Sequence, residues 1–200
     1  DESVLLVTET NVPSQENLEY FGNGDEAHII YNFSLSPLIL HALLSGDSTF
    51  LKRWMMTTAP TSDNCTILNF TASHDGIGLR PLEGILQKED VSKMVELAKE
   101  FGGEVSTRDR HGVETPYELN ITFYDMLKGS FSGIDDYQME RFIASQTIMM
   151  SVEGIPAFYI QSLFGSKNDA RRMRQTGQKR AKKSNKPTAM EPGRASEKVR

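Results

Sequence analysis

The alternation of short apolar runs with helical patterns is the feature that most narrows the choice of fold. Runs rich in aliphatic, β-branched and aromatic residues predict buried strands at residues 3–8, 27–33, 65–71 and 155–161. Helices are predicted between them, near residues 15–20, 36–46, 48–56, 90–101 and 136–152. Parallel strands need crossover connections of this kind, so the order predicts an α/β protein with a parallel sheet.

Several of the predicted helices carry signals at their ends. Ser36 is the predicted N-cap of the first long helix, with Pro37 at its first position and Gly46 just beyond its end. Asp90 is the predicted cap of the helix that closes at Gly102. The inward face of the last helix is predicted to hold Met139, Phe142, Ile143, Met149 and Met150.

Composition excludes several classes of protein. No run approaches the ~20 apolar residues that a membrane helix needs, so no membrane partner is expected. Cys65 is the only cysteine, which excludes a disulfide scaffold and suits a reducing compartment. No signal-peptide pattern is present, so a cytoplasmic location is expected. The chain opens on Asp1 and runs straight into a strand, which predicts a piece of something longer.

The net charge of −5 hides an asymmetry along the chain. Residues 171–200 carry eleven Lys or Arg and two Glu, which leaves −14 on the rest. Such a basic end is typical of a nucleic-acid-binding tail, and this class is one alternative. The tail has no aromatic residue for base stacking, and the acidic remainder would repel a polyanion, so no nucleic-acid partner is expected.

Acidic side chains directly follow two of the predicted strands. Glu9 comes after the first strand, and His74 and Asp75 come after the third. In a barrel or an open doubly wound sheet, the C-terminal ends of parallel strands carry the chemistry. Two converging carboxylates suit glycoside chemistry, which needs a proton donor and a stabiliser of an oxocarbenium-like state. The alternative interpretation makes Glu9 a rim acid and Asp75 a turn residue.

The motifs of common cofactors do not occur in the 200 residues. Neither GxGxxG nor GxxxxGK[ST] is found, so no dinucleotide or nucleotide-phosphate loop is predicted. Neither HExxH nor CxxC nor a close His pair is found, so no metal is predicted. We therefore expect no cofactor.

Several separated segments, in order, carry a resemblance to a known family. They are residues 7–13 (VTETNVP), 20–22, 26–28, 35–41, 69–78 (NFTASHDGIG), 116–120 (PYELN) and 154–160 (GIPAFYI). These segments resemble the sucrose phosphorylase branch of the α-amylase-type glycoside hydrolase family. Residues 79–84 look more like its members that act on glucosylglycerate or sucrose 6′-phosphate, and the likeness covers about residues 1–180.

The resemblance implies a (β/α)8 TIM barrel of the α-amylase type, of which this chain would hold strands five to eight. Residues 1–75 would carry strands five to seven, 76–134 a long excursion, 135–170 helix seven and strand eight, and 171–200 a disordered or aberrant basic tail. The family carries its nucleophilic aspartate after strand four, in a Gly-x-Arg-x-Asp motif. No such motif occurs in the 200 residues, so the chain alone is expected to be inactive.

The resemblance also implies roles for single residues. Glu9 would be the general acid/base, Asp75 the transition-state stabiliser and His74 a ligand of the glucosyl hydroxyls. Tyr117, Glu118 and Asn120 resemble a family segment beside the acceptor side of the pocket and would bind substrate. Phosphate or the acceptor needs donors, and Arg80 and Arg108 are candidates because arginine matches phosphate geometry well. Alternatively, each arginine is a solvated surface charge, and Tyr117 packs within its loop.

The implied activity is that of a retaining glucoside phosphorylase. Its substrates would be a sucrose-like or glucosylglycerate-like α-glucoside and inorganic phosphate, and its product would be α-glucose 1-phosphate. Burial near other acids would raise the pKa of Glu9 toward neutrality and suit it to both proton transfers. A retaining α-glucosidase or transglucosidase with the same carboxylates is the alternative enzyme. The acceptor and the oligomeric state stay open.

Overall fold

A small parallel sheet organises the fold. The computed structural model describes residues 4–58, 64–110 and 112–169, and the predicted basic tail lies outside these ranges. The strands are β1 (Val7–Thr8), β2 (Ile29–Tyr31), β3 (Thr66–Asn69) and β9 (Ile155–Pro156). They pair in the order β1-β2-β3-β9, and each neighbouring pair runs parallel. The predicted α/β class with a parallel sheet is therefore confirmed.

The fourth predicted strand is wrong beyond its second residue. β9 ends at Pro156, and the run ends in a short helix, α7 (Ile160–Leu163). A short apolar run has no period that separates a strand from a buried helical turn. β9 also pairs with β3 alone in the described sheet, so fewer ladder hydrogen bonds extend it.

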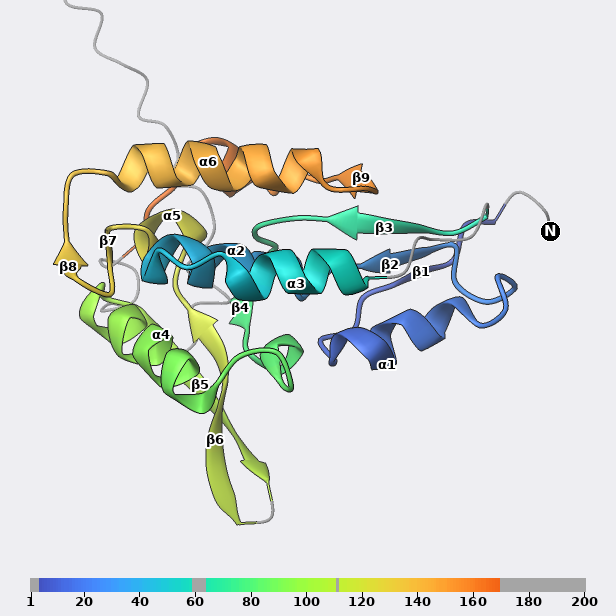
Figure 1. Ribbon diagram of the computed structural model, residues 1–200, viewed down its shortest axis with the longest axis horizontal. Helices are drawn as coiled ribbons and strands as arrows, with labels where there is room; N and C mark the ends of the chain where they lie inside the picture. Colours follow the sequence, from blue (N-terminus) through green and yellow to red (C-terminus); the bar gives the residue numbers. More distant parts are fainter. Residues whose placement is uncertain (1–3, 59–63, 111, 170–200) are drawn as a thin grey trace, which may run out of the picture.

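Helices connect the strands and lie along the sheet (Figure 1). They are α1 (Ser14–Leu18), the short 3-10 helix η1 (Glu19–Phe21), α2 (Leu35–Ser45), α3 (Thr49–Thr57) and α6 (Gln138–Ser151). α2 packs against both α3 and α6. A small core of Ala27, Ile30 and Ile67 packs against side chains of α1 and η1. None of the helices in the described ranges is long and apolar enough to cross a membrane.

An excursion of mixed structure separates β3 from α6. Its elements are β4 (Ile77–Gly78), η2 (Arg80–Leu82), α4 (Lys88–Glu100), β5 (Glu104–Arg110), β6 (Val113–Asn120), α5 (Phe123–Met126), β7 (Gly129–Ser130) and β8 (Gly133–Ile134). β4, β6 and β5 form an antiparallel sheet, and the β5–β6 hairpin projects from the body (Figure 1). The main core joins this excursion to α2, with Leu38 and Ile39 in one cluster with Met94, Leu119 and Met126.

Two helix starts differ from the prediction. α2 begins at Leu35 with Ser34 before it, so Ser36 is not the cap; its hydroxyl donates to the carbonyl of Thr71 at 2.5 Å. Buried hydroxyls are hydrogen-bonded in folded proteins, and the carbonyl of Thr71 supplies the partner of Ser36. α4 begins at Lys88, so Asp90 lies inside the first turn, where the helix dipole favours its charge. The predicted end of α2 is confirmed, because Gly46 adopts a left-handed conformation with φ 74°.

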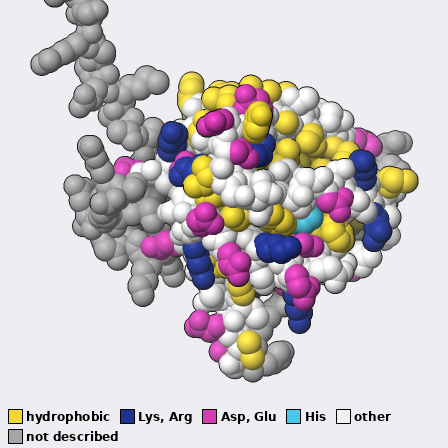
Figure 2. Space-filling view, turned by 60° about the vertical axis from the view of Figure 1, so that its left-hand side comes forward, with side chains coloured by type: hydrophobic (Ala, Val, Ile, Leu, Met, Phe, Trp, Pro, Cys, Tyr) yellow, Lys and Arg dark blue, Asp and Glu magenta, His cyan; other side chains and the backbone are white. Residues whose placement is uncertain are grey.

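Helix α6 carries two apolar stripes instead of the single inward face predicted. Phe142 and Met149 are buried, but Met139, Ile143 and Met150 are 51%, 58% and 50% exposed. The exposed three share a face at helical spacing, next to the buried stripe. Hydrophobic side chains accordingly gather on the upper part of the surface in Figure 2, the level at which α6 lies in Figure 1. The helical spacing of apolar residues in the sequence does not show which of the two stripes of α6 is buried in the core.

Among the described histidines, His41 alone is buried. It sits on α2 with its ring 5.5 Å from that of Phe50 and 6.0 Å from that of Phe131. Its Nε2 lies 3.7 Å from a carboxylate oxygen of Asp90. Burial lowers the pKa of His41, and this outweighs the opposing attraction of Asp90 and Asp47; Lys93 lowers the pKa further.

The sign of the shift gives a pH prediction. The folded state disfavours protonated His41, so the unfolded chain binds this proton more readily. The free energy of unfolding therefore has its full value above pH 6.5 and decreases as the pH falls from 6.5 toward the lowered pKa of folded His41. The variant His41→Gln should therefore lose less stability than the parent chain between pH 7.5 and 5.0 in urea titrations. His74→Gln, at a side chain that is 68% exposed, is the matched control. Equal pH slopes for the parent and His41→Gln would contradict the prediction.

Candidate active site

Three predicted residues converge where the parallel strands end. Glu9 follows β1, and His74 and Asp75 lie in the segment that follows β3. A carboxylate oxygen of Glu9, a carboxylate oxygen of Asp75 and a ring nitrogen of His74 all lie within 4.8 Å of one another. The imidazole Nε2 of His74 is 3.8 Å from a carboxylate oxygen of Asp75. Carboxyl ends of parallel strands meet at one edge of a sheet, which explains why residues 65 positions apart are neighbours.

These residues open into a hollow of about 300 Å³. Its lining residues are Glu9, Asn11, Phe33, His74, Asp75, Gly76, Tyr117 and Glu118. They come from the ends of β1 and β2, from the segment after β3 and from β6. The excursion thus supplies one wall and the parallel sheet the other. Three carboxylates and an imidazole give the hollow the groups for proton transfer and for stabilising positive charge.

The burial expected for Glu9 is not seen. Glu9 is exposed, His74 is exposed, and the Asp75 side chain is 29% exposed. β1 lies at the edge of the described sheet, and Val7 beside Glu9 is itself 50% exposed. Low burial follows from this edge position, because in the described residues only β2 pairs with β1.

The segment around Asp75 is held by hydrogen bonds on both sides. The backbone N–H of Asp75 donates to the hydroxyl of Ser73 at 3.1 Å. The backbone N–H of Gly76 donates to Oε1 of Glu118 at 2.7 Å. β4 then pairs with β6, with Ile77 opposite Leu119. These contacts fix the position of Asp75 relative to the hairpin.

The other predicted residues divide into two groups. Tyr117 lines the hollow. Arg108 is not among the lining residues, but its guanidinium lies 5.7 Å from the centre of the Tyr117 ring. Asn120 is 2% exposed, donates to the hydroxyl of Ser106 at 2.7 Å and does not line the hollow. Arg80 also lies outside the lining and forms an ion pair with Glu16 at 3.4 Å.

Sequence reasoning missed Asn11 and Phe33. Asn11 lies three residues after the end of β1 and Phe33 two residues after the end of β2, so the strand-end argument that selected Glu9 also applies to them. Asn11 packs against Gly78, where an added Cβ would lie 2.7 Å from Oδ1 of Asn11. Phe33 packs edge-on against Phe70, with ring centres 5.3 Å apart. Asparagine and phenylalanine carry no charge, so a criterion based on titratable groups does not select them.

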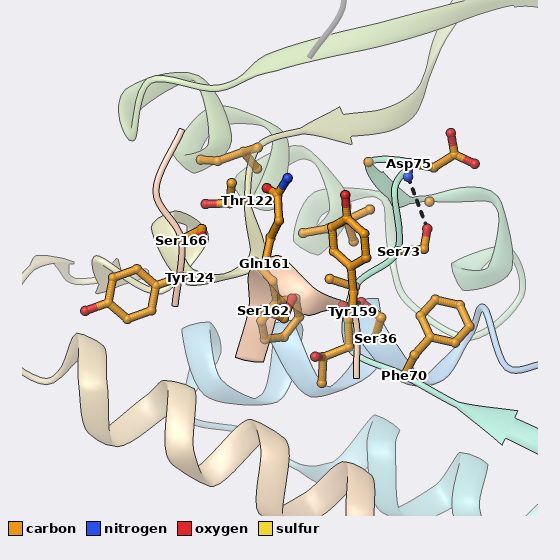
Figure 3. Close-up of a pocket in the computed structure, with 17 residues that line it drawn as sticks. Ser36, Phe70, Ser73, Asp75, Thr122, Tyr124, Tyr159, Gln161, Ser162 and Ser166 are labelled. Atoms are coloured by element: carbon orange, nitrogen blue, oxygen red, sulfur yellow. Dashed lines mark hydrogen bonds between the residues drawn. The ribbon is translucent and has the colours of Figure 1, made fainter. Parts of the chain in front are cut away.

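A second, smaller cavity of about 30 Å³ adjoins the hollow at Asp75 and Gly76. Figure 3 shows Tyr159 and Gln161, from the segment after β9, among the side chains that line it. Burial raises the pKa of the Tyr159 phenol above its ordinary value. The phenol therefore stays protonated near neutral pH and keeps a hydroxyl donor beside the segment that carries Asp75.

No family model matches the chain. Among curated proteins, it is 46% identical over 168 residues to the glucosylglycerate phosphorylase of Allomeiothermus silvanus, covering 83% of the chain and 30% of that protein. It is 42% identical over 179 residues to the glucosylglycerate phosphorylase of Escherichia coli, and the match covers 88% of this chain and 32% of that protein. It is 32% identical over 187 residues to the sucrose phosphorylase of Agrobacterium vitis, and the match covers 88% of this chain and 35% of that protein.

The fold is also similar to a solved structure. Sucrose 6F-phosphate phosphorylase from Thermoanaerobacter thermosaccharolyticum aligns with a TM-score of 0.72 at 19% identity, over 91% of this chain and 35% of that one. The fold is thus that of part of this larger α/β structure. The chain is homologous to a part of the sucrose phosphorylase-like glucoside phosphorylases, as the resemblance indicated. It spans about a third of the length of the curated relatives it matches.

Proposed function

We propose that this chain supplies the acid/base and stabilising side of the active site of a retaining glucoside phosphorylase, as strands five to eight of a (β/α)8 barrel. The observation that carries the proposal is the convergence of Glu9, His74 and Asp75 within 4.8 Å at the strand ends. Homology to glucosylglycerate and sucrose phosphorylases supports the same class. The substrates are an α-glucoside and inorganic phosphate.

The proposed reaction is a double displacement. A nucleophilic carboxylate from outside these 200 residues attacks the anomeric carbon, and the glycosidic C–O bond breaks while Glu9 protonates the leaving oxygen. A phosphate oxygen then attacks the glucosyl ester, Glu9 takes the proton from phosphate, and the carboxylate leaves. The product is α-glucose 1-phosphate with retained configuration. Asp75 stabilises the positive charge that develops on the sugar ring in both steps.

The substrate contacts follow from the lining of the hollow. His74 is 68% exposed and lies beside Asp75, so its imidazole is free to bind glucosyl hydroxyls. Tyr117 lines the hollow on the hairpin side, and Arg108 lies over its ring, where the leaving group and phosphate would bind. Glucosylglycerate carries a carboxylate and phosphate is an anion, so a guanidinium at this rim suits both.

A chimera tests the proposed function. Residues 4–169 of this chain would replace the matching segment of the Escherichia coli glucosylglycerate phosphorylase, to which the chain is 42% identical. We expect phosphate-dependent release of glucose 1-phosphate from a glucosylglycerate donor by the chimera and none by the 200-residue chain alone. Glucose release that does not depend on phosphate would instead support the hydrolase alternative. A folded chimera without turnover would contradict the proposal.

Arg108 gives a specificity prediction in the same chimera. Arg108→Ala should raise the KM for glucosylglycerate about tenfold or more, because a hydrogen bond to a charged group is lost. The KM for sucrose, a neutral donor, should change little. Arg53→Ala, at an exposed position on α3, is the matched control. If the KM for phosphate rises and that for glucosylglycerate does not, Arg108 binds phosphate and not the leaving group.

A further inference from the structure

Glu118 combines a negative charge with nearly complete burial. The residue lies on β6 and is 5% exposed, although it lines the hollow. A buried carboxylate is costly unless hydrogen bonds replace its water. Its Oε1 receives such a bond, at 2.7 Å, from the backbone N–H of Gly76. The resemblance implied that Glu118 binds substrate, but this oxygen is engaged with the protein's own backbone.

The partner of Glu118 is the peptide that follows Asp75. Gly76 comes directly after Asp75, and the β4–β6 ladder begins one residue later with Ile77 opposite Leu119. The hydrogen bond from Gly76 to the Glu118 side chain therefore extends the contact between β4 and β6 by one residue, to the peptide that joins Asp75 and Gly76. On the other side, the hydroxyl of Ser73 accepts the N–H of Asp75 at 3.1 Å.

The close approach of the two segments requires a glycine. A Cβ at residue 76 would lie 2.4 Å from the carbonyl oxygen of Leu119 and 2.8 Å from Cγ of Glu118. No side chain fits at these distances without moving the backbone of β6. Gly76 thus brings its N–H within reach of the carboxylate, and the carboxylate holds the peptide there.

We infer that Glu118 is a positioning residue for Asp75: its buried carboxylate fixes the Asp75–Gly76 peptide and so aims the Asp75 side chain into the hollow. A charge-assisted hydrogen bond is roughly twice as strong as a neutral one, which explains a glutamate at a buried position. The inference rests on the proposed function only for its effect on turnover, because the hydrogen bond itself can be measured without substrate.

The hydrogen bond is tested first, on the 200-residue chain. Amide hydrogen exchange followed by NMR should show a protected Gly76 amide in the parent chain and exchange at least tenfold faster in Glu118→Ala. Glu118→Gln keeps an acceptor oxygen and should retain most of the protection. Glu114→Ala removes an exposed carboxylate from the same strand and is the matched control. Unchanged Gly76 protection in Glu118→Ala would overturn the inference.

The catalytic effect is tested in the chimera. Glu118→Ala should lower kcat about 100-fold with a KM for the donor within a few-fold of the parent value, since misplacement of a catalytic group slows the chemical step. Glu118→Gln should recover most of kcat. A raised KM with unchanged kcat would mean substrate binding and would overturn the positioning role. An inactive parent chimera would count against the proposed function and leave the exchange result standing.

Discussion

The kcat of phosphorolysis by the chimera is expected to fall by about 10²–10⁴-fold when Glu9 is replaced by glutamine, the range typical of a lost general acid/base. Glutamine keeps the size of the side chain but can neither give nor take the proton. Glu9 is placed for this role because it follows β1. One of its carboxylate oxygens lies within 4.8 Å of a ring nitrogen of His74 and of a carboxylate oxygen of Asp75. Initial rates of glucose 1-phosphate release at saturating phosphate measure the loss.

A donor with a good leaving group sharpens this test. The fluoride of α-glucosyl fluoride leaves without a proton, so formation of the glucosyl-enzyme should stay fast in Glu9→Gln while transfer to glycerate-type acceptors stays slow. Glu96→Gln, an exposed glutamate on α4, is the matched control. If formation of the glucosyl-enzyme slowed equally on the fluoride and the glycoside in Glu9→Gln, Glu9 would not be the proton donor.

Asp75→Asn is expected to lower kcat by about 10²–10³-fold on every donor, including the fluoride. The substitution removes a negative charge and keeps the shape of the side chain. The positive charge on the sugar ring develops whichever leaving group departs, so a good leaving group cannot restore the rate. Parallel assays on glucosylglycerate and α-glucosyl fluoride measure this difference between the Asp75 and Glu9 variants.

Asp136→Asn provides the control for the charge change, because Asp136 is exposed and lies outside the lining of the hollow. It should leave kcat and KM unchanged. Full activity of Asp75→Asn on the fluoride would show that Asp75 does not stabilise the ring. Glu9 would then act without the stabilising partner proposed here.

The parallel sheet and the site at its end are predictable because both depend on local patterns. Apolar runs locate the strands, and the C-terminal ends of parallel strands must share an edge, so Glu9 and Asp75 could be paired before any coordinates. Residues 155–161 are the exception, because this one apolar run contributes to both β9 and α7. Local hydrophobicity cannot decide which of two elements a short run forms.

The role of Glu118 depends on pairing across the chain, and no local pattern shows it. The bond from Gly76 to Glu118 joins residues 42 positions apart and exists because β4 pairs with β6. Asn120, two residues further along the same strand, shares the motif of Glu118 but bonds to Ser106 instead. The motif PYELN therefore mixes residues that line the hollow with one that holds the hairpin together.

The edge strand β1 has a consequence for the behaviour of the chain in solution. Leu5, Leu6 and Val7 are 67%, 52% and 50% exposed, and in the described sheet β1 has a neighbour on one side only. An exposed apolar segment that leads into an edge strand is a template on which a strand of another molecule can add. Light scattering by the 200-residue chain should therefore rise with its concentration, and a charged residue at Leu6 should slow that growth more than the same charge at exposed Met56.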